Sequence, residues 1–260
     1  MKNFLFSDVH GCYDGLIGAL DKAGYDPENP NHQLYSGGDD FGRSDFSKDN
    51  SGSLKIYKFL TSKEHKNKPK IVFSNHHDIL LQMLDSEFLS YTDVYNGEHK
   101  TLGSFAGLTG DEVIMFGPEV AFERTKKLGI RRWLKTLPFF YDIEGGYRLV
   151  HGWMPNENGV ILKDLEIDRE RWIESTWCHT EDEIWRFCEA YPNGWEKTLV
   201  FGHWHTCQLH LLTEGEDKGN YDIWQDKRHK LIGLDPCSYV SRKVNVLVIE
   251  NGKVTNPELQ

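Results

Sequence analysis

The sequence lacks the features of several protein classes. Its 260 residues include only five cysteines, and no two of them form a Cys-x-x-Cys pair. An odd number of cysteines without such pairs is a poor disulfide framework and a poor structural zinc pattern, and free thiols suit a reducing compartment. We therefore expect a cytoplasmic protein. We expect no redox activity, because no two cysteines have suitable spacing.

Long apolar runs and an excess of basic residues are also missing. No run approaches the roughly 20 residues of a membrane helix, and the N-terminus offers no apolar stretch long enough for a signal peptide. With 40 acidic and 30 basic residues, the formal net charge is −10, whereas a broad nucleic-acid surface is normally basic. We expect neither a membrane nor a nucleic-acid partner. A small anionic substrate is compatible with this charge, because bound divalent metals reverse the local sign. The sequence does not indicate the oligomeric state.

Short apolar runs recur along the chain, and each stops abruptly at polar or metal-binding residue types. We interpret each run as a buried strand; the runs are NFLF, HQLYSGG, KIVFS, YRLV, TLVFG and KLIGL. Helical patterns follow over 13–24, 78–89 and 118–137, and a hairpin with Asn251-Gly252 at its turn is expected near the C-terminus. Early strands that alternate with helices predict an α/β fold.

The region from about 160 to 195 is rich in aromatic and acidic residues. It includes Trp172, Trp177, Trp185 and Trp195. One interpretation is a helical layer with half-buried rings. The other is a cap whose rings stack on a base or cover a substrate.

The ends of the predicted strands carry a set of potential metal ligands. Open α/β sheets bind ligands at the carboxyl ends of their strands, and Asp-x-His or His-x-His places two side chains on one face of an extended segment. The set is Asp8, His10, Asp39, Asn75, His76, His151, His203 and His205.

The composition of this set favours two metals. Mixed carboxylate, amide and imidazole ligands suit Mn, Fe, Zn or Co better than Mg, and cysteine, typical of structural zinc sites, is absent. Alone, Asp-x-His-Gly could be a turn, and Asn75 could cap a helix. Five such motifs, each following an apolar run, favour a two-metal hydrolase site instead.

Several motifs, in this order, resemble those of the calcineurin-like metallophosphoesterase superfamily. The detail is similar to its phosphoprotein-phosphatase branch, which includes bacterial and phage protein phosphatases and symmetrical diadenosine tetraphosphatases. The stretches that carry the resemblance are FSDVHGCYDGL, GGDDFGRS, FSNHHDIL, YNGEHKTL and LPFFYDIEGGYRLVHGWMP, together with GHWH near residue 203. The resemblance extends over about residues 1–250. It implies one metallophosphoesterase domain over 1–260, a two-sheet sandwich flanked by helices (α/β/β/α), with a Trp-rich helical cap inserted around 160–195.

The resemblance also implies roles for individual residues. A first metal would be held by Asp8, His10, Asp39 and His205, and a second by Asp39, Asn75, His151 and His203, with Asp39 bridging. His76 would protonate the leaving oxygen or stabilise charge there. Arg43 would bind phosphate through its planar guanidinium.

Some positions depart from the pattern of the branch. Gly42 stands where an aspartate usually pairs with the catalytic histidine, and Asp40, Asp45 or Asp78 could orient His76 instead. A second phosphate-binding arginine has no clear match, so His179 in STWCHT is a candidate substrate-binding residue. Tyr239, in GLDPCSY, is another.

We therefore predict hydrolysis of phosphoesters by a metal-bound hydroxide on two divalent ions, with Mn²⁺ as the first choice. The expected substrate is a small phosphoester or a nucleotide such as diadenosine tetraphosphate. A serine/threonine protein phosphatase is the alternative. A catalytically weak metal-binding scaffold is an alternative of another class, motivated by Gly42.

Overall fold

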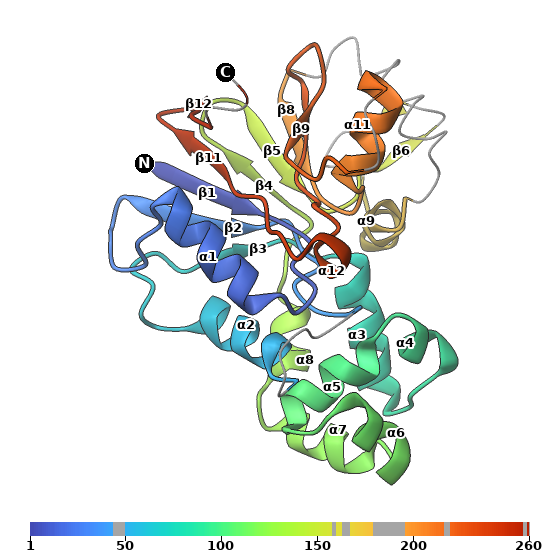
Figure 1. Ribbon diagram of the computed structural model, residues 1–260. Helices are drawn as coiled ribbons and strands as arrows, with labels where there is room; N and C mark the ends of the chain where they lie inside the picture. Colours follow the sequence, from blue (N-terminus) through green and yellow to red (C-terminus); the bar gives the residue numbers. More distant parts are fainter. Residues whose placement is uncertain are drawn as a thin grey trace.

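Two five-stranded sheets form the centre of the molecule. The computed structural model describes residues 1–43, 50–157, 160–162, 167–178, 196–215, 219–256 and 259. The first sheet has the order β12-β11-β1-β2-β3, and the second β4-β5-β8-β10-β9 (Figure 1). A separate hairpin pairs β6 (Asn156–Glu157) with β7 (Val160–Ile161).

Each sheet has a parallel part. In the first sheet, β1 (Lys2–Phe6), β2 (His32–Ser36) and β3 (Lys70–Ile71) are parallel, and β11 (Leu247–Glu250) and β12 (Lys253–Val254) complete it antiparallel. In the second, β5 (Tyr147–Val150), β8 (Thr198–Phe201) and β10 (Leu231–Gly233) are parallel, between β4 (Phe140–Ile143) and β9 (Trp224–Gln225). The carboxyl ends of the three parallel strands in each sheet therefore lie at the same edge of that sheet.

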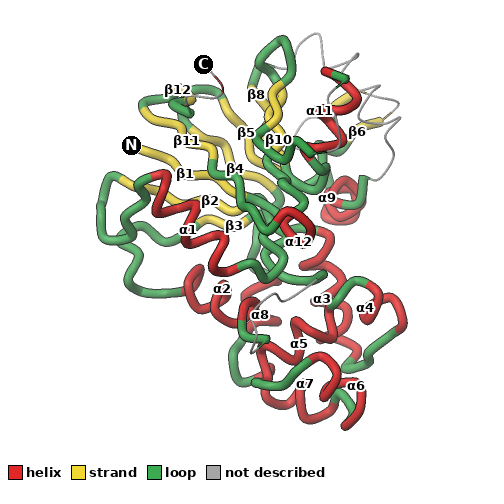
Figure 2. The backbone as a smooth tube through the Cα atoms, viewed as in Figure 1, coloured by secondary structure: helices red, strands yellow, loops and turns green. Residues whose placement is uncertain are grey.

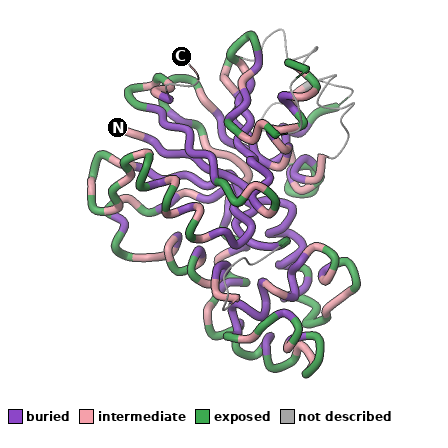
Figure 3. Tube along the Cα trace, in the orientation of Figure 1, coloured by how far each residue is buried: buried purple, intermediate pink, exposed green. Residues whose placement is uncertain are grey.

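The two sheets share one buried layer. Leu5 packs with Val200 and Ile232 between the sheets, whereas its neighbours Phe4 and Phe6 face the opposite side of the first sheet, against helices. This alternation follows from the two-residue period of a strand. The inner strands β1, β2, β5, β8, β10 and β11 are buried almost throughout, whereas β4 and β12 at the sheet edges are largely half-buried or exposed (Figure 3).

Helices cover the outer faces, as Figure 2 shows. The first sheet is covered by α1 (Tyr13–Ala23) and α2 (Gly52–Thr61), and the second by α9 (Arg169–Thr176) and α11 (Thr206–Glu214). A short helix, α12 (Ser238–Ser241), follows β10. Mixed α/β structure with two sheets flanked by helices confirms the predicted fold class.

A group of helices extends from one end of the sandwich (Figure 1). After α3 (Asn75–Ser86), the chain forms α4 (Tyr91–Tyr95), α5 (Glu98–Ala106), α6 (Gly110–Phe116), α7 (Glu119–Lys126) and α8 (Ile130–Leu134). We call residues 91–134 the helical lobe. The single helix expected over 118–137 is wrong: Gly129, with φ 72°, breaks it between α7 and α8. A left-handed residue cannot continue a right-handed helix.

The other local predictions mostly hold. All six runs contain strands, although β3 covers only Lys70–Ile71. The C-terminal hairpin turns at Asn251-Gly252, whose positive φ angles of 51° and 73° suit a type I′ turn. The helix predicted after the third strand begins at Asn75, but Ser74, not Asn75, is its N-cap: the Ser74 hydroxyl accepts from the His77 backbone N–H at 3.3 Å.

Only the first part of the predicted Trp-rich cap is described. Trp172, on α9, is buried and stacks on Phe139 and Phe140 with ring centroids 5.7 and 5.3 Å apart. This packing agrees with the interpretation as a core layer for that ring, while Trp185 and Trp195 lie outside the described residues. Within the described part, no helix is long and apolar enough to cross a membrane.

Candidate functional site

The predicted ligands gather where the parallel strands of both sheets end. Asp8 and His10 follow β1, Asp39 follows β2, and Asn75 and His76 open α3 after β3. From the second sheet, His151 follows β5 and His203 follows β8. The inter-sheet packing brings these two halves of the chain together, so residues nearly 200 positions apart become neighbours.

The backbone at this edge is strained. Asp8, His10, Asp39 and His203 all have φ between 47° and 62°, and Arg43 has φ 59°. This left-handed region is unfavourable for side chains other than glycine and persists only when the surroundings enforce it. Such outliers cluster at functional sites, and here they coincide with the residues predicted from sequence.

Asp39 lies at the centre of the group. Its carboxylate is 3.7 Å from His10 Nε2, 4.0 Å from His76 Nε2 and 3.4 Å from His151 Nε2. Burial raises the pKa of Asp39, but the positive charges that His151, His76 and His10 carry when protonated at low pH outweigh it and hold that pKa well below its usual range. Asp39 is therefore a carboxylate, the charge form that a cation requires.

Two of the imidazoles are oriented by backbone carbonyls. Their Nδ1 atoms lie within hydrogen-bond distance of these carbonyls: His10 Nδ1 is 3.1 Å from the Phe41 oxygen, and His151 Nδ1 is 2.9 Å from the Gly37 oxygen. Because Nδ1 donates, Nε2 of each neutral ring keeps its lone pair for a metal. Burial lowers the pKa of both histidines, which keeps them neutral. His151 Nε2 also lies 2.6 Å from Asn75 Oδ1.

Asp8 is held against the second sheet. Both oxygens of its carboxylate accept a hydrogen bond from the His203 backbone N–H at 3.0 Å. A Cβ on Gly202 would lie 2.1 Å from Asp8 Oδ2, so only glycine permits this approach of the two strand ends. Burial raises the pKa of Asp8 well above its ordinary value, and Asp235 and Asp39 raise it further. Part of this shift comes from repulsion among neighbouring carboxylates, which a bound cation would relieve.

His205 faces a carboxylate that the ligand set left out. Its Nε2 lies 3.7 Å from Asp235 Oδ2, and Asp235 is buried at the end of β10. Burial raises the pKa of Asp235 to about 6. The signal for Asp235 was its position after the apolar run KLIGL, the same pattern that singled out the other residues.

His76 has a carboxylate partner that sequence reasoning missed. Glu98 Oε1, from the first turn of α5, lies 2.8 Å from His76 Nδ1. Of the three aspartates considered for this position, Asp40 pairs with His77 at 3.3 Å, and Asp78 accepts a hydrogen bond from Gln82 at 2.8 Å. Asp45 lies outside the described residues. The expectation that Asp40 or Asp78 orients His76 is therefore wrong.

Arg43 and Tyr239 lie together beside the cluster. The Arg43 guanidinium lies 5.0 Å from the centroid of the Tyr239 ring, and that ring is 6.0 Å from His10 and 5.7 Å from His205. The Arg43 backbone N–H donates to the Asn96 carbonyl at 2.6 Å. A cation and a phenol are thus available to a substrate at the cluster. His179 lies outside the described residues.

The donor set fits divalent metals. His10, Asp39 and His76 offer ligand atoms within 4.8 Å of one another, and so do Asp39, His151 and His203. Asp39 is common to both groups, which is the arrangement expected of a bridging carboxylate. Oxygen and imidazole donors without thiolate suit Mn, Fe, Zn or Co. His76 belongs to the first of these groups, although the family resemblance implies a catalytic role for it and not a role as metal ligand.

Comparison with known proteins supports the resemblance. No protein-family model matches the chain. A symmetrical bis(5'-nucleosyl)-tetraphosphatase from Enterobacter sp. (strain 638) is 24% identical over 246 residues, covering 78% of this chain and 81% of the relative. The chain resembles the phosphoprotein-phosphatase branch of the metallophosphoesterases. The motif-based prediction of that resemblance is confirmed.

Solved structures support the fold. A cold-active protein tyrosine phosphatase solved at 1.1 Å superposes with a TM-score of 0.57 at 17% identity, covering 97% of this chain and 75% of that one. A protein serine/threonine phosphatase from Saccharomyces cerevisiae gives a TM-score of 0.52 at 15% identity, covering 90% and 66%. At these identities the similarity speaks for the fold alone.

Proposed function

We propose that the chain is a metal-dependent phosphoesterase that acts on a small nucleotide substrate of the dinucleoside polyphosphate class. The broader prediction, a hydrolase of phosphoester or phosphoanhydride bonds, is confirmed by the similarity to the tetraphosphatase. The metal dependence rests on one observation: two groups of donors, buried except for the half-buried His203, converge on the same carboxylate, Asp39.

The ligand assignment is the one that the family resemblance implies. One ion would be held by Asp39 and His10 with Asp8 and His205, and the other by Asp39 and His151 with Asn75 and His203. The pair would supply Lewis acidity that polarises a phosphoryl oxygen and acidifies water. Mn²⁺ is the ion to test first, since a set rich in imidazole and carboxylate accepts it readily.

The chain's own residues bind the phosphoryl group and protonate its leaving oxygen. Arg43 lies beside the cluster, and its guanidinium can hold two phosphoryl oxygens at once. His76 Nε2 faces the cluster at 4.0 Å from Asp39 Oδ2, while Nδ1 is engaged by Glu98. As the bond between phosphorus and the leaving oxygen breaks and a water oxygen bonds to phosphorus, protonated His76 gives its Nε2 proton to the leaving oxygen, and the proton that the water loses restores His76.

The substrate class rests on the sequence relative. Its name specifies symmetrical bis(5'-nucleosyl)-tetraphosphates, and the exposed Arg43 with its adjacent Tyr239 ring offers one charged and one aromatic contact to such a molecule. Aromatic rings stack on bases, and guanidinium groups bind phosphates.

The test is hydrolysis of diadenosine tetraphosphate, p-nitrophenyl phosphate and a phosphoserine peptide, with Mn²⁺ and with chelator. We expect turnover that chelator abolishes, with diadenosine tetraphosphate preferred by kcat/KM. His76→Ala should lower kcat by about 100-fold or more. A suitable control is His65→Ala, because His65 is also buried but bonds Tyr25 and Phe59 away from the site. No metal-dependent turnover of any of the three substrates would refute the proposal, and preference for the peptide would refute its substrate class.

A further inference from the structure

The contact between His76 and Glu98 joins the helical lobe to the strand-end cluster. His76 begins α3 directly after the first sheet, whereas Glu98 belongs to α5. Both side chains are buried, at 1% and 0% exposure. The 2.8 Å separation of His76 Nδ1 from Glu98 Oε1 leaves His76 Nε2 turned toward Asp39.

Among the described residues, the side-chain hydrogen bond of Glu98 is the one to His76. Its second oxygen, Oε2, is buried without a hydrogen-bond partner among the described residues. Burying a carboxyl is costly unless it is paired. In the described part of the chain, the hydrogen bond to His76 offsets the desolvation cost of burying the Glu98 carboxyl. A residue whose role was to tie the lobe together would instead satisfy both oxygens within the lobe.

The space for Glu98 exists because residue 42 has no side chain. A Cβ on Gly42 would lie 2.2 Å from His76 Nδ1 and 2.7 Å from Glu98 Oε1. Gly42 also has φ 87°, a conformation that other residues rarely adopt. A side chain at position 42 and the Glu98–His76 contact therefore exclude each other.

The lobe holds Glu98 in place through the loop that carries Arg43. The Gly42 backbone N–H donates to Thr101 Oγ1 at 3.0 Å, and the Arg43 N–H donates to the Asn96 carbonyl. Gly97, with φ 80°, precedes Glu98, and a Cβ there would lie 2.1 Å from the Arg43 carbonyl oxygen. Residues 96 to 101 thus dock on residues 42 and 43, and the N-terminus of α5 favours a carboxylate at Glu98.

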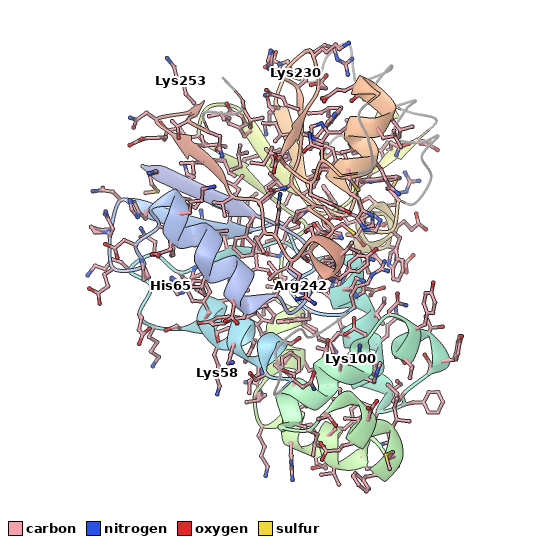
Figure 4. The ribbon with its side chains drawn as sticks, viewed as in Figure 1. Lys58, His65, Lys100, Lys230, Arg242 and Lys253 are labelled. Atoms are coloured by element: carbon pink, nitrogen blue, oxygen red, sulfur yellow. The ribbon has the colours of Figure 1, made fainter. Side chains whose placement is uncertain are left out.

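We propose that Glu98 is the positioning residue of His76, supplied by the helical lobe and admitted by Gly42. This inference rests on the proposed phosphoesterase function for its kinetic consequence. Glu98 fixes the Nδ1 proton of His76 and so directs Nε2 toward the leaving oxygen. Gly42 replaces the aspartate that the branch usually has, and this replacement motivated the scaffold alternative. In this chain, Glu98 on α5 supplies the carboxylate instead. Figure 4 labels Lys100 on α5, the helix that carries Glu98, and Arg242 at the end of α12.

The experiment compares Glu98→Gln with Asp93→Asn. Both changes remove a buried carboxylate near the start of a lobe helix, but the Asp93 carboxylate accepts from the Ser90 backbone N–H at 2.6 Å, at the beginning of α4, instead of contacting His76. In Glu98→Gln we expect kcat to fall by roughly 10- to 100-fold with KM within about twofold. The loss should be larger for phenyl phosphate than for p-nitrophenyl phosphate, because the more basic leaving oxygen depends more on the proton from His76. Asp93→Asn should leave kcat and this ratio unchanged.

A second pair of variants tests the same contact without touching Glu98. Gly42→Ala places a Cβ against His76 Nδ1 and Glu98 Oε1, whereas Gly107→Ala imposes a similar positive φ of 70° with no atom within 4 Å of the new Cβ. Gly42→Ala should reproduce the leaving-group effect of Glu98→Gln, and Gly107→Ala should not. Equal loss in Gly42→Ala and Gly107→Ala would contradict the proposal.

A readout independent of turnover separates this inference from the proposed function. In metal-free protein, the His76 Nδ1 proton should give a far-downfield NMR signal that Glu98→Gln shifts and Asp93→Asn does not. If the wild type hydrolyses no phosphoester, the proposed function fails while this signal still tests the contact. If the wild type is active and Glu98→Gln matches it in kcat and leaving-group ratio, Glu98 is not a positioning residue.

Discussion

The strand-end cluster and the helical lobe use backbone strain differently. At the cluster, the residues in left-handed conformation carry functional groups: Asp8, His10, Asp39 and His203. In the lobe, which the structure describes throughout, every positive φ belongs to a glycine, at positions 97, 107, 117 and 129. The lobe thus uses glycine, which adopts positive φ without strain, at its turns. The cluster instead holds aspartate and histidine side chains in this unfavourable backbone conformation.

The difference shows what each region contributes. Strain at a non-glycine residue persists where the side chain is needed and the surroundings enforce its geometry. The cluster therefore holds the reactive groups, and the lobe is an ordinary helical packing whose contribution to the site comes through the turn from 96 to 101. The comparison predicts large chemical effects at the cluster and graded structural effects elsewhere.

The largest effect is expected at Asp39, which both groups of ligands share. Asp39→Asn should lower kcat by about 1,000-fold or more and reduce the number of metal ions bound, because the shared negative charge is lost. Elemental analysis and steady-state kinetics would measure both. Asp78→Asn is the matched control, since Asp78 is also buried nearby but bonds Gln82; full activity and two bound ions in Asp39→Asn would break the comparison.

The next effect is expected where the lobe docks on the cluster. Gly97→Ala combines an unfavourable positive φ with a Cβ 2.1 Å from the Arg43 carbonyl oxygen. We expect a loss of about 2–3 kcal/mol in the free energy of unfolding, together with reduced kcat. Gly107→Ala carries the strain alone and should lose about 1 kcal/mol with activity retained. Chemical denaturation measures the two values, and equal values would show that the docking contact is unimportant.

A smaller effect on stability is expected from removal of the ion pair between Asp142 on β4 and Arg148 on β5. Arg148 is buried and donates to Asp142 through Nε and a terminal nitrogen at 2.8 and 2.9 Å. Asp142→Asn should cost about 1–2 kcal/mol of unfolding free energy without changing kcat.

The effect of Asp142 should depend on pH in a defined direction. Burial raises the pKa of Asp142, but hydrogen bonds from Arg148 and Lys197 bring it below the ordinary 3.8. A pKa lowered by folding stabilises the protein above the unfolded value, and this contribution is lost as pH falls through the folded pKa. The difference in melting temperature between wild type and Asp142→Asn should therefore be constant near neutral pH and shrink below about pH 4. A difference that grows on acidification would contradict this account.

The smallest effect is expected on the exposed surface of the lobe. Met115 and Phe116 on α6 are 75% and 72% exposed, so little apolar burial is lost when they are replaced. Met115→Ser and Phe116→Ser should each change the unfolding free energy by less than about 0.5 kcal/mol and leave kcat unchanged. A larger destabilisation would mean that α6 packs against something in solution.

The sequence predicted the cluster better than it predicted the lobe. Strands that end at Asp8, Asp39, His151 and His203 could be read from apolar runs followed by polar residues, because the period and length of buried strands leave a strong local pattern. The helix expected over 118–137 instead breaks at Gly129, because a glycine within a helical pattern can either be tolerated or end the helix. Nothing in the local pattern chooses between these outcomes.

The partner of His76 shows most clearly what the sequence could not predict. Asp40, Asp45 and Asp78, the candidates that the sequence offers, lie near Gly42 or His76 in the chain. Glu98 is 22 positions beyond His76 and reaches it only because residues 96–101 dock on residues 42 and 43. No local periodicity records that contact.

By itself, the sequence determined the six strands of the apolar runs, the C-terminal hairpin, the α/β class and which residues stand at the ends of those strands, since these follow from hydrophobic period and residue chemistry over a few positions. Only the tertiary structure decided that two sheets bring those ends to one edge, that Asp39 is shared by both groups and that Glu98 pairs with His76. These are distances between segments far apart in the chain, and packing, not local propensity, sets them.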